Sequence, residues 1–222
     1  MFTSDHGEAM GAHQLKLKGP AVYDDISRVP LIFEGPGVPK AAVYPHTVSH
    51  IDIPATILDY FGIHIPVCFQ GHSLMKQIKG DTAHTGRPAF IEFNRYEVDH
   101  DGFGGFQPMR AIITDTHKLS LHLTDEDELY ERHSDPEDMV NRILDPVLNT
   151  TRNALHEELL TWMNETRDPF RGYQWRCRSW RNDYTPNLRC DGYTRQPENE
   201  PWEPRQLDYS TGLPMEKSVR PK

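Results

Sequence analysis

The stretch Val29-Pro30-Leu31-Ile32-Phe33, with Gly35-Pro36-Gly37 behind it, gives the first indication of the fold class. A short apolar run that ends at a glycine-proline turn is typical of a buried strand. Between positions 52 and 61 apolar residues recur at helical spacing, and a glycine follows: Ile53, Ile57, Leu58, Phe61 and Gly62. Because a strand, a turn and a helix follow each other, this region predicts an α/β layer.

A different pattern occupies residues 86–166. Short strand-like runs follow each other closely at 89–93, 109–114 and 118–123, and a fourth begins at 129–130. The dipeptide Asp115-Thr116 predicts a hairpin turn between the second run and the third. Apolar residues at helical spacing from about 147 to 165 predict one amphipathic helix. We therefore expect a small antiparallel sheet packed on that helix.

These patterns divide the chain into three parts. We expect residues 1–85 to belong to the α/β domain, residues 86–166 to form a small α+β subdomain, and residues 167–222 to form an extended irregular tail. The tail is rich in proline, arginine and aromatic residues and has little periodicity. Because indole rings are costly to leave in water, Trp175, Trp180 and Trp202 predict that parts of the tail lie against the body.

Composition limits the classes of partner. The formal net charge of −9 disfavours nonspecific binding to nucleic acid or to anionic membranes. No apolar stretch approaches the roughly 18 residues that a membrane span needs. The three cysteines, Cys68, Cys177 and Cys190, do not make a disulfide-dense scaffold. Whether Cys177 and Cys190 pair, the compartment and the oligomeric state are left open by the sequence.

The residues Asp5-His6-Gly7 are the first candidate for chemistry. A carboxylate and an imidazole are both ligands of divalent cations, and the glycine allows the backbone bend that two adjacent ligands require. Taken alone, the triplet also fits a helix N-cap or a turn. The acidic run at 125–128 is interpreted as a solvated turn rather than a cation site.

Two more residues of the same region could act on a substrate. Lys18 could reach back over the pocket and place a point charge on a sulfate or phosphate oxygen, although nearby Lys16 shows that an ordinary surface lysine is the alternative. His13 could donate a proton to a leaving group, or could be a loop histidine bonded to backbone. His46 and His50 flank a helix start and are interpreted as structural.

Taken in order, these segments resemble the sulfatase family of the alkaline-phosphatase-like superfamily. The resemblance covers roughly residues 1–165 and rests on six segments: 2–8, 18–20, 28–32, 48–58, 70–74 and 128–141. They are similar to the family's metal-binding strand end, its substrate-lysine loop and next strand, its Asp-x-x-Pro-Thr helix, the Gly-His-Ser segment, and the segment that closes the C-terminal sheet. Residues 53–56, Ile-Pro-Ala-Thr, depart slightly from the sequence that is commonest in the family at this segment.

The resemblance implies the C-terminal part of an alkaline-phosphatase-like α/β sandwich and the hydrolysis of a small-molecule sulfate ester. In the family, a formylglycine hydrate attacks sulfur while calcium and basic residues stabilise charge. By position, Asp5 and His6 map to metal ligands, and Lys18 maps to the catalytic lysine that holds the ester oxygen. His13 has a less secure catalytic counterpart. Histidine at position 6 also occurs in phosphonate monoester hydrolases, which leaves manganese as an alternative to calcium.

The family's nucleophile motif, Cys/Ser-x-Pro-x-Arg, does not occur in these 222 residues. We therefore expect that the chain begins inside an active site and that it has no turnover alone. Half of a parallel sheet would expose an unpaired edge and a bare apolar face, so we also expect self-association. The alternatives are a phosphonate monoester or phosphodiester hydrolase of the same superfamily, or a non-catalytic accessory protein that reuses the fold.

Overall fold

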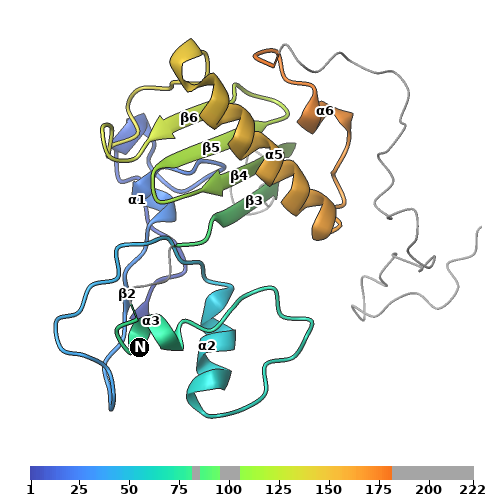
Figure 1. Ribbon diagram of the computed structural model, residues 1–222. Helices are drawn as coiled ribbons and strands as arrows, with labels where there is room; N and C mark the ends of the chain where they lie inside the picture. Colours follow the sequence, from blue (N-terminus) through green and yellow to red (C-terminus); the bar gives the residue numbers. More distant parts are fainter. Residues whose placement is uncertain (82–85, 96–105, 182–222) are drawn as a thin grey trace, which may run out of the picture.

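The computed structural model describes residues 1–81, 86–95 and 106–181 (Figure 1). A four-stranded sheet crossed by a long helix forms one part, and the segments that carry the N-terminus, β2, α2 and α3 form the other. The class is mixed α/β, as the sequence predicts. In the described ranges, no helix is long and apolar enough to cross a membrane.

The four predicted strand runs form one antiparallel sheet. The strands are β3 (Ala89–Arg95), β4 (Phe106–Ile113), β5 (His117–His122) and β6 (Glu128–Glu131), in the order β3-β4-β5-β6. The hairpin turn between β4 and β5 is closed by a hydrogen bond from the Thr114 N–H to the His117 carbonyl, 2.9 Å long. The predictions of the strands and of the turn are therefore confirmed.

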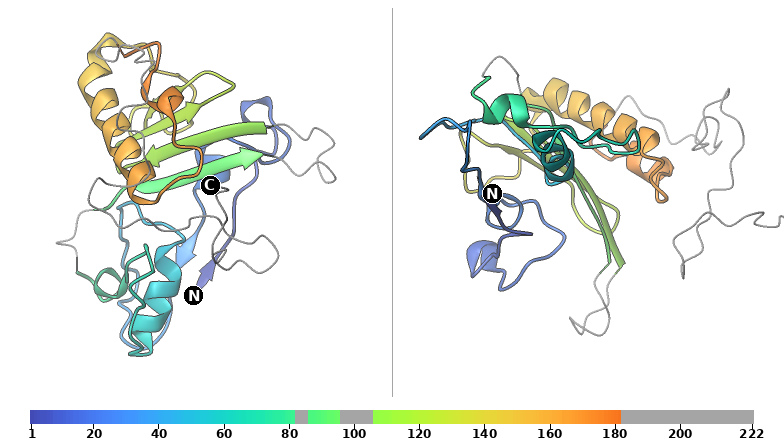
Figure 2. Two further views of the ribbon diagram at one scale, coloured as in Figure 1. Left: turned by 90° about the vertical axis from the view of Figure 1, so that its right-hand side faces the viewer. Right: turned by 90° about the horizontal axis from the view of Figure 1, so that it is seen from below.

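The two faces of this sheet pack on different parts of the chain, because successive residues of a strand point to opposite sides. The helix α5 (Asn149–Glu165), which follows the short helix η2 (Pro146–Leu148), packs on the sheet face that carries Ile112 and Leu119. On the opposite face, Val22 packs against neighbouring residues of β4, Ala111 and Ile113. Figure 2 shows α5 on one side of the sheet and the N-terminal loops on the other.

The first residues after α5 pack against the four-stranded sheet and α5. Trp175, in the short helix α6 (Tyr173–Arg176), is wholly buried, and Trp180 is 9% exposed; both belong to the same core as α5. The predicted contact between the tail and the body is confirmed for these two residues, although the backbone at Trp175 is helical. Trp202 and Cys190, and with Cys190 the question of its pairing with Cys177, lie outside the described residues.

The strand predicted at 29–33 is much shorter and less buried than expected. Only β2 (Leu31–Ile32) is extended; it pairs antiparallel with β1 (Phe2–Thr3), and Ile32 is 56% exposed. The prediction of a buried strand at 29–33 is therefore wrong in its length and its burial. A two-residue ladder offers few hydrogen bonds, and among the described residues no further strand pairs with it.

The helix α2 (Asp52–Tyr60) is confirmed, and Gly62, at φ 67°, follows its end. The Asp52 carboxylate accepts hydrogen bonds from the backbone N–H groups of Ser49 (3.1 Å) and His72 (2.8 Å). The Thr56 hydroxyl accepts one from the Leu74 N–H at 2.9 Å. The acid and the threonine of the Asp-x-x-Pro-Thr segment thus fasten residues 72–74 onto α2, just before α3 (Met75–Ile78).

Candidate functional site

Three of the four predicted site residues lie together. His6 directly follows Asp5 in the turn after β1, and its Nε2 lies 3.3 Å from Asp5 Oδ2. Lys18 comes from the loop that precedes α1 (Asp24–Ser27), and its Nζ lies 2.7 Å from the same Nε2. The imidazole therefore lies between the carboxylate and the ammonium. We call Asp5, His6 and Lys18 the N-terminal cluster.

The local backbone sets the chemistry of His6. Its Nδ1 lies 2.7 Å from the Gly7 carbonyl oxygen, which can only accept a hydrogen bond. Nδ1 must therefore carry a proton, and the lone pair of the neutral ring is left on Nε2. That lone pair accepts from the Lys18 ammonium. It is also the atom through which His6 would bind a cation, so a cation there would have to displace the lysine.

Backbone groups also favour the ionised form of Asp5. The His6 N–H donates to Asp5 Oδ1 over 3.0 Å, and this bond is the largest cause that lowers the pKa of Asp5 below its ordinary value. The Ser4 hydroxyl lies 3.3 Å from the same oxygen. The side chain of Asp5 is 82% exposed, which leaves its other oxygen open to a ligand.

Gly7 is a steric requirement of this turn. Its N–H donates to the Ile26 carbonyl over 2.8 Å, which joins the N-terminal cluster to the end of α1. A Cβ built on Gly7 would lie 1.9 Å from the Asp25 carbonyl oxygen, far inside van der Waals contact. The sequence predicts a backbone bend at this glycine, and the structure adds close packing against α1 as a second reason.

His13 does not join the N-terminal cluster through any contact with its three residues. It lies in the short helix η1 (Ala12–Gln14) at φ 51°, and its ring stacks on Tyr23 with centroids 3.7 Å apart. Its Nε2 is 3.9 Å from Asp25 Oδ2, and its side chain is 12% exposed. His50, interpreted as structural, holds the turn from the other side, because its Nε2 lies 2.8 Å from the Ser4 carbonyl.

The chain offers part of a cation site. Calcium takes about six to eight oxygen ligands, whereas this cluster supplies the carboxylate of Asp5 and Nε2 of His6. Across residues 1–81, 86–95 and 106–181, no three His, Cys, Asp or Glu side chains are grouped closely enough to hold a metal ion. The donor types fit a divalent cation, but further ligands must come from elsewhere.

The acidic run at 125–128 is not a wholly solvated turn. Asp127 is 6% exposed, and its carboxylate lies 2.5 Å from the Arg178 guanidinium. The indole N–H of Trp180 donates to the same carboxylate over 2.7 Å. The interpretation as a solvated turn is wrong for Asp127, because Arg178 and Trp180 from the chain after α5 cover it.

Comparison with known proteins defines the class. Residues 14–165 match the family described as "N-sulphoglucosamine sulphohydrolase, C-terminal", and the chain belongs to this family. The chain is 43% identical over 216 residues to the protein named "Uncharacterized sulfatase YidJ" of Escherichia coli (strain K12). That match takes in 97% of this chain and 42% of the relative. The chain thus spans about two fifths of the length of this relative.

Solved structures share the fold. A 2-O GAG sulfatase superposes with a TM-score of 0.68 at 25% identity, over 76% of this chain and 36% of that one. A phosphonate monoester hydrolase from Silicibacter pomeroyi gives a TM-score of 0.61 at 25% identity, over 73% of this chain and 34% of that one. The predicted alkaline-phosphatase-like fold and the resemblance to sulfatases are therefore confirmed, and the neighbours are hydrolases of two ester classes.

Proposed function

We propose that this chain forms the C-terminal portion of a metal-dependent sulfuric ester hydrolase. The observation that carries the proposal is the N-terminal cluster: the two residues that match metal ligands and the lysine that matches the substrate residue meet within 3.3 Å. Membership of a sulfatase C-terminal family supports it. Calcium is the proposed cation, with manganese as the alternative.

Each residue has a defined part in this proposal. Asp5 and His6 Nε2 would hold the divalent cation, which when bound supplies Lewis-acid stabilisation of the ester oxygens. Lys18 would bind the sulfate as a point charge, because a cation on His6 Nε2 displaces the ammonium from that atom and leaves it for a sulfate oxygen. We also propose His13, whose Nε2 lies 3.9 Å from Asp25 Oδ2, as the proton donor to the leaving group.

The covalent step requires a nucleophile that these 222 residues do not supply. No Cys/Ser-x-Pro-x-Arg motif is present, and relatives of this chain are more than twice as long. The lone chain should therefore fold around half a site and hydrolyse nothing. The test is to fuse the part of the E. coli relative outside the match to this chain and to assay both proteins on an aryl sulfate.

A second candidate, a phosphonate monoester hydrolase, is favoured by the structural neighbour of that activity and by the histidine at position 6. The fused protein should be assayed on a phosphonate monoester as well. Sulfatase function predicts a kcat/KM at least about tenfold higher on the aryl sulfate, and the reverse ratio would favour the second candidate. A folded fusion without turnover on either ester would favour an accessory protein instead.

A further inference from the structure

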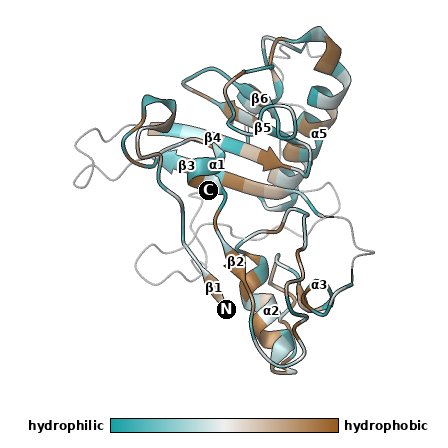
Figure 3. Ribbon diagram, turned by 90° about the vertical axis from the view of Figure 1, so that its left-hand side faces the viewer, coloured by the Kyte–Doolittle hydropathy of each residue, from teal (hydrophilic) through white to brown (hydrophobic). Residues whose placement is uncertain are grey.

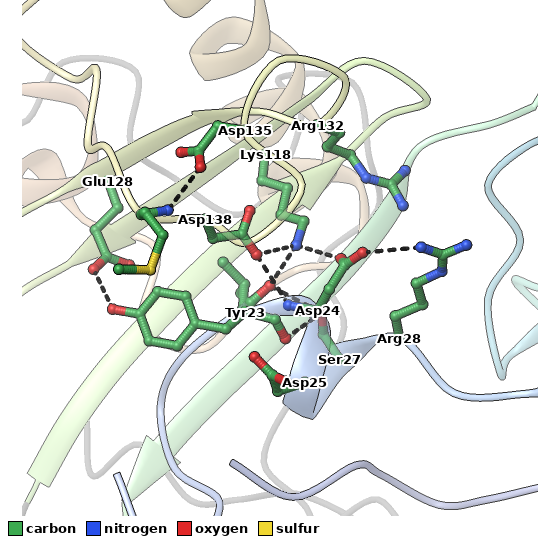
Figure 4. Close-up of polar contacts among 12 residues, drawn as sticks. Tyr23, Asp24, Asp25, Ser27, Arg28, Lys118, Glu128, Arg132, Asp135 and Asp138 are labelled. Carbon is green, nitrogen blue, oxygen red and sulfur yellow. Dashed lines mark hydrogen bonds and ion pairs between the residues drawn. The ribbon is translucent and has the colours of Figure 1, made fainter. Parts of the chain in front are cut away.

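A buried lysine contacts the segment around α1, on the sheet face opposite α5. Lys118, in β5, is 1% exposed. Its Nζ lies 2.6 Å from Asp138 Oδ2 and 3.1 Å from the Val22 carbonyl oxygen, and it also pairs with the Asp24 carboxylate. Figure 4 shows the ammonium between the two carboxylates. One cation of the sheet thus binds backbone and side-chain oxygens of the segment around α1.

Two more polar contacts join the segment around α1 to β6 and to the loop that follows β6. The Asp24 N–H donates to Asp138 Oδ2 over 3.0 Å, and the Tyr23 hydroxyl donates to Glu128 Oε1 over 3.0 Å (Figure 4). Burial, followed by the charge of Glu128, raises the pKa of Tyr23 to about 12, so the phenol remains a donor. Side chains of Lys118, Asp138 and Glu128 therefore all bind the start of α1.

The α1 segment leads from these anchors to both halves of the N-terminal cluster. Lys18 lies four residues before Val22. A hydrogen bond from the Ala21 N–H to the Gly19 carbonyl, 2.8 Å long, constrains the backbone between them. At the other end of α1, the Ile26 carbonyl accepts from Gly7, next to His6. Lys18 and the Asp5-His6 turn are thus attached at opposite ends of α1, so a displacement of α1 on the sheet would change their position relative to each other.

A gain in stability is a weak explanation for burying this lysine. Desolvation of buried ion pairs consumes most of their attraction, and a packed apolar residue is often no less stable at such a site. An ammonium between two carboxylates and a carbonyl does, however, select one position of the segment that it binds. We propose that Lys118 is a positioning residue that fixes α1 on the sheet, and with it the contact between His6 and Lys18.

This role rests on the proposed function of the N-terminal cluster, but its test needs no turnover. The variant Asp24→Asn removes the carboxylate at the start of α1 and leaves the ion pair between Lys118 and Asp138 in place. Asp25→Asn is the matched control, since it makes the same charge change in the same turn but faces His13. Lys118→Met and Lys118→Arg, compared with each other, test rescue by a conservative replacement.

Two measurements on the 222-residue chain report the outcome. In Asp24→Asn we expect the amide of Gly7 to exchange at least about tenfold faster, while amides of β4 and β5 stay within about twofold. We also expect the nuclear Overhauser contact between the His6 ring and the Lys18 side chain to be lost. Asp25→Asn should leave the exchange rate of the Gly7 amide and the His6–Lys18 contact unchanged. Lys118→Arg should retain more of the Gly7 protection and more of that contact than Lys118→Met.

Two results would overturn the positioning role. One is an unchanged contact between His6 and Lys18 in both Asp24→Asn and Lys118→Met. The other is an equal loss of protection in β4, β5 and Gly7, which would make Lys118 a general stabiliser of the fold. Failure of the proposed function would show separately, as a fused protein that folds and hydrolyses neither ester.

Discussion

Arg110 and Asp168 form a bidentate ion pair in the core, where neither side chain is more than 2% exposed. The second bond of the pair, from Nη2 to Oδ1, is 2.9 Å long. The guanidinium also lies 5.4 Å from the ring centroid of Trp175. The pair therefore ties β4 to the chain after α5 and holds α6 against the sheet.

Removing the acid of this pair should cost much of the stability of the fold. Asp168→Ala leaves a buried guanidinium without its counter-charge, and we expect the free energy of unfolding to fall by about 3–5 kcal/mol. Urea unfolding followed by circular dichroism measures it. Glu92→Ala is the control, because Glu92 approaches the same guanidinium at 3.8 Å from a 55% exposed position. It should cost less than about 1 kcal/mol, and equal costs would contradict burial as the cause.

Gly7→Ala should disrupt the turn that carries Asp5 and His6. Because the added Cβ would meet backbone, which cannot swing aside, we expect a loss of about 2 kcal/mol or more in the free energy of unfolding. In Gly172→Ala the new Cβ would lie 3.1 Å from the flexible Gln174 side chain and 3.7 Å, an ordinary contact, from the Phe170 carbonyl oxygen, so that variant should lose about 0.5 kcal/mol or less. Thermal melts of the two variants side by side decide the matter; similar melting temperatures would refute the close packing.

His156 should make the fold sensitive to mild acid. Burial lowers its pKa from 6.5 to about 4, although its ring lies 2.7 Å from the Trp175 carbonyl oxygen. The unfolded chain binds the proton first, so the contribution to stability is complete above pH 6.5 and is lost as the pH falls toward 4. The loss amounts to about 3 kcal/mol. The free energy of unfolding should depend less on pH in this range for His156→Gln than for the parent chain. An equal pH dependence in the variant and the parent chain would disprove the assignment.

Exposed apolar side chains on and after α2 should make the lone chain self-associate. Figure 3 shows hydrophobic segments on α2, β1 and β2, and the exposed large side chains around α2 are Ile57, Tyr60, Phe61, Ile63 and Val67. Sedimentation velocity should show dimers or larger species that are reduced by the double variant Phe61→Ser, Val67→Ser. A monodisperse parent chain with a cooperative melt would count against an uncovered face.

The sequence predicted what local patterns determine. The strands at 89–95 and 117–122 and the long helix α5 follow from periodicity, and the proximity of Lys18 to Asp5 and His6 follows from the order of the motifs. The buried anchor at Lys118 was missed, because its partners Asp24 and Asp138 come from distant segments and a lysine in a strand gives no sign of burial. The exposure of Ile32 was missed because an apolar run does not tell what covers it.

The most direct test of the central claim is the effect of Lys18→Met on aryl sulfate hydrolysis by the fused protein, measured against Lys16→Met. Because Lys18 is the proposed sulfate ligand and its Nζ lies next to the proposed metal ligand His6, its loss should lower kcat/KM by about 100- to 1000-fold, whereas Lys16→Met should leave it nearly unchanged. Equal activity of the two variants would contradict a sulfate site at the N-terminal cluster.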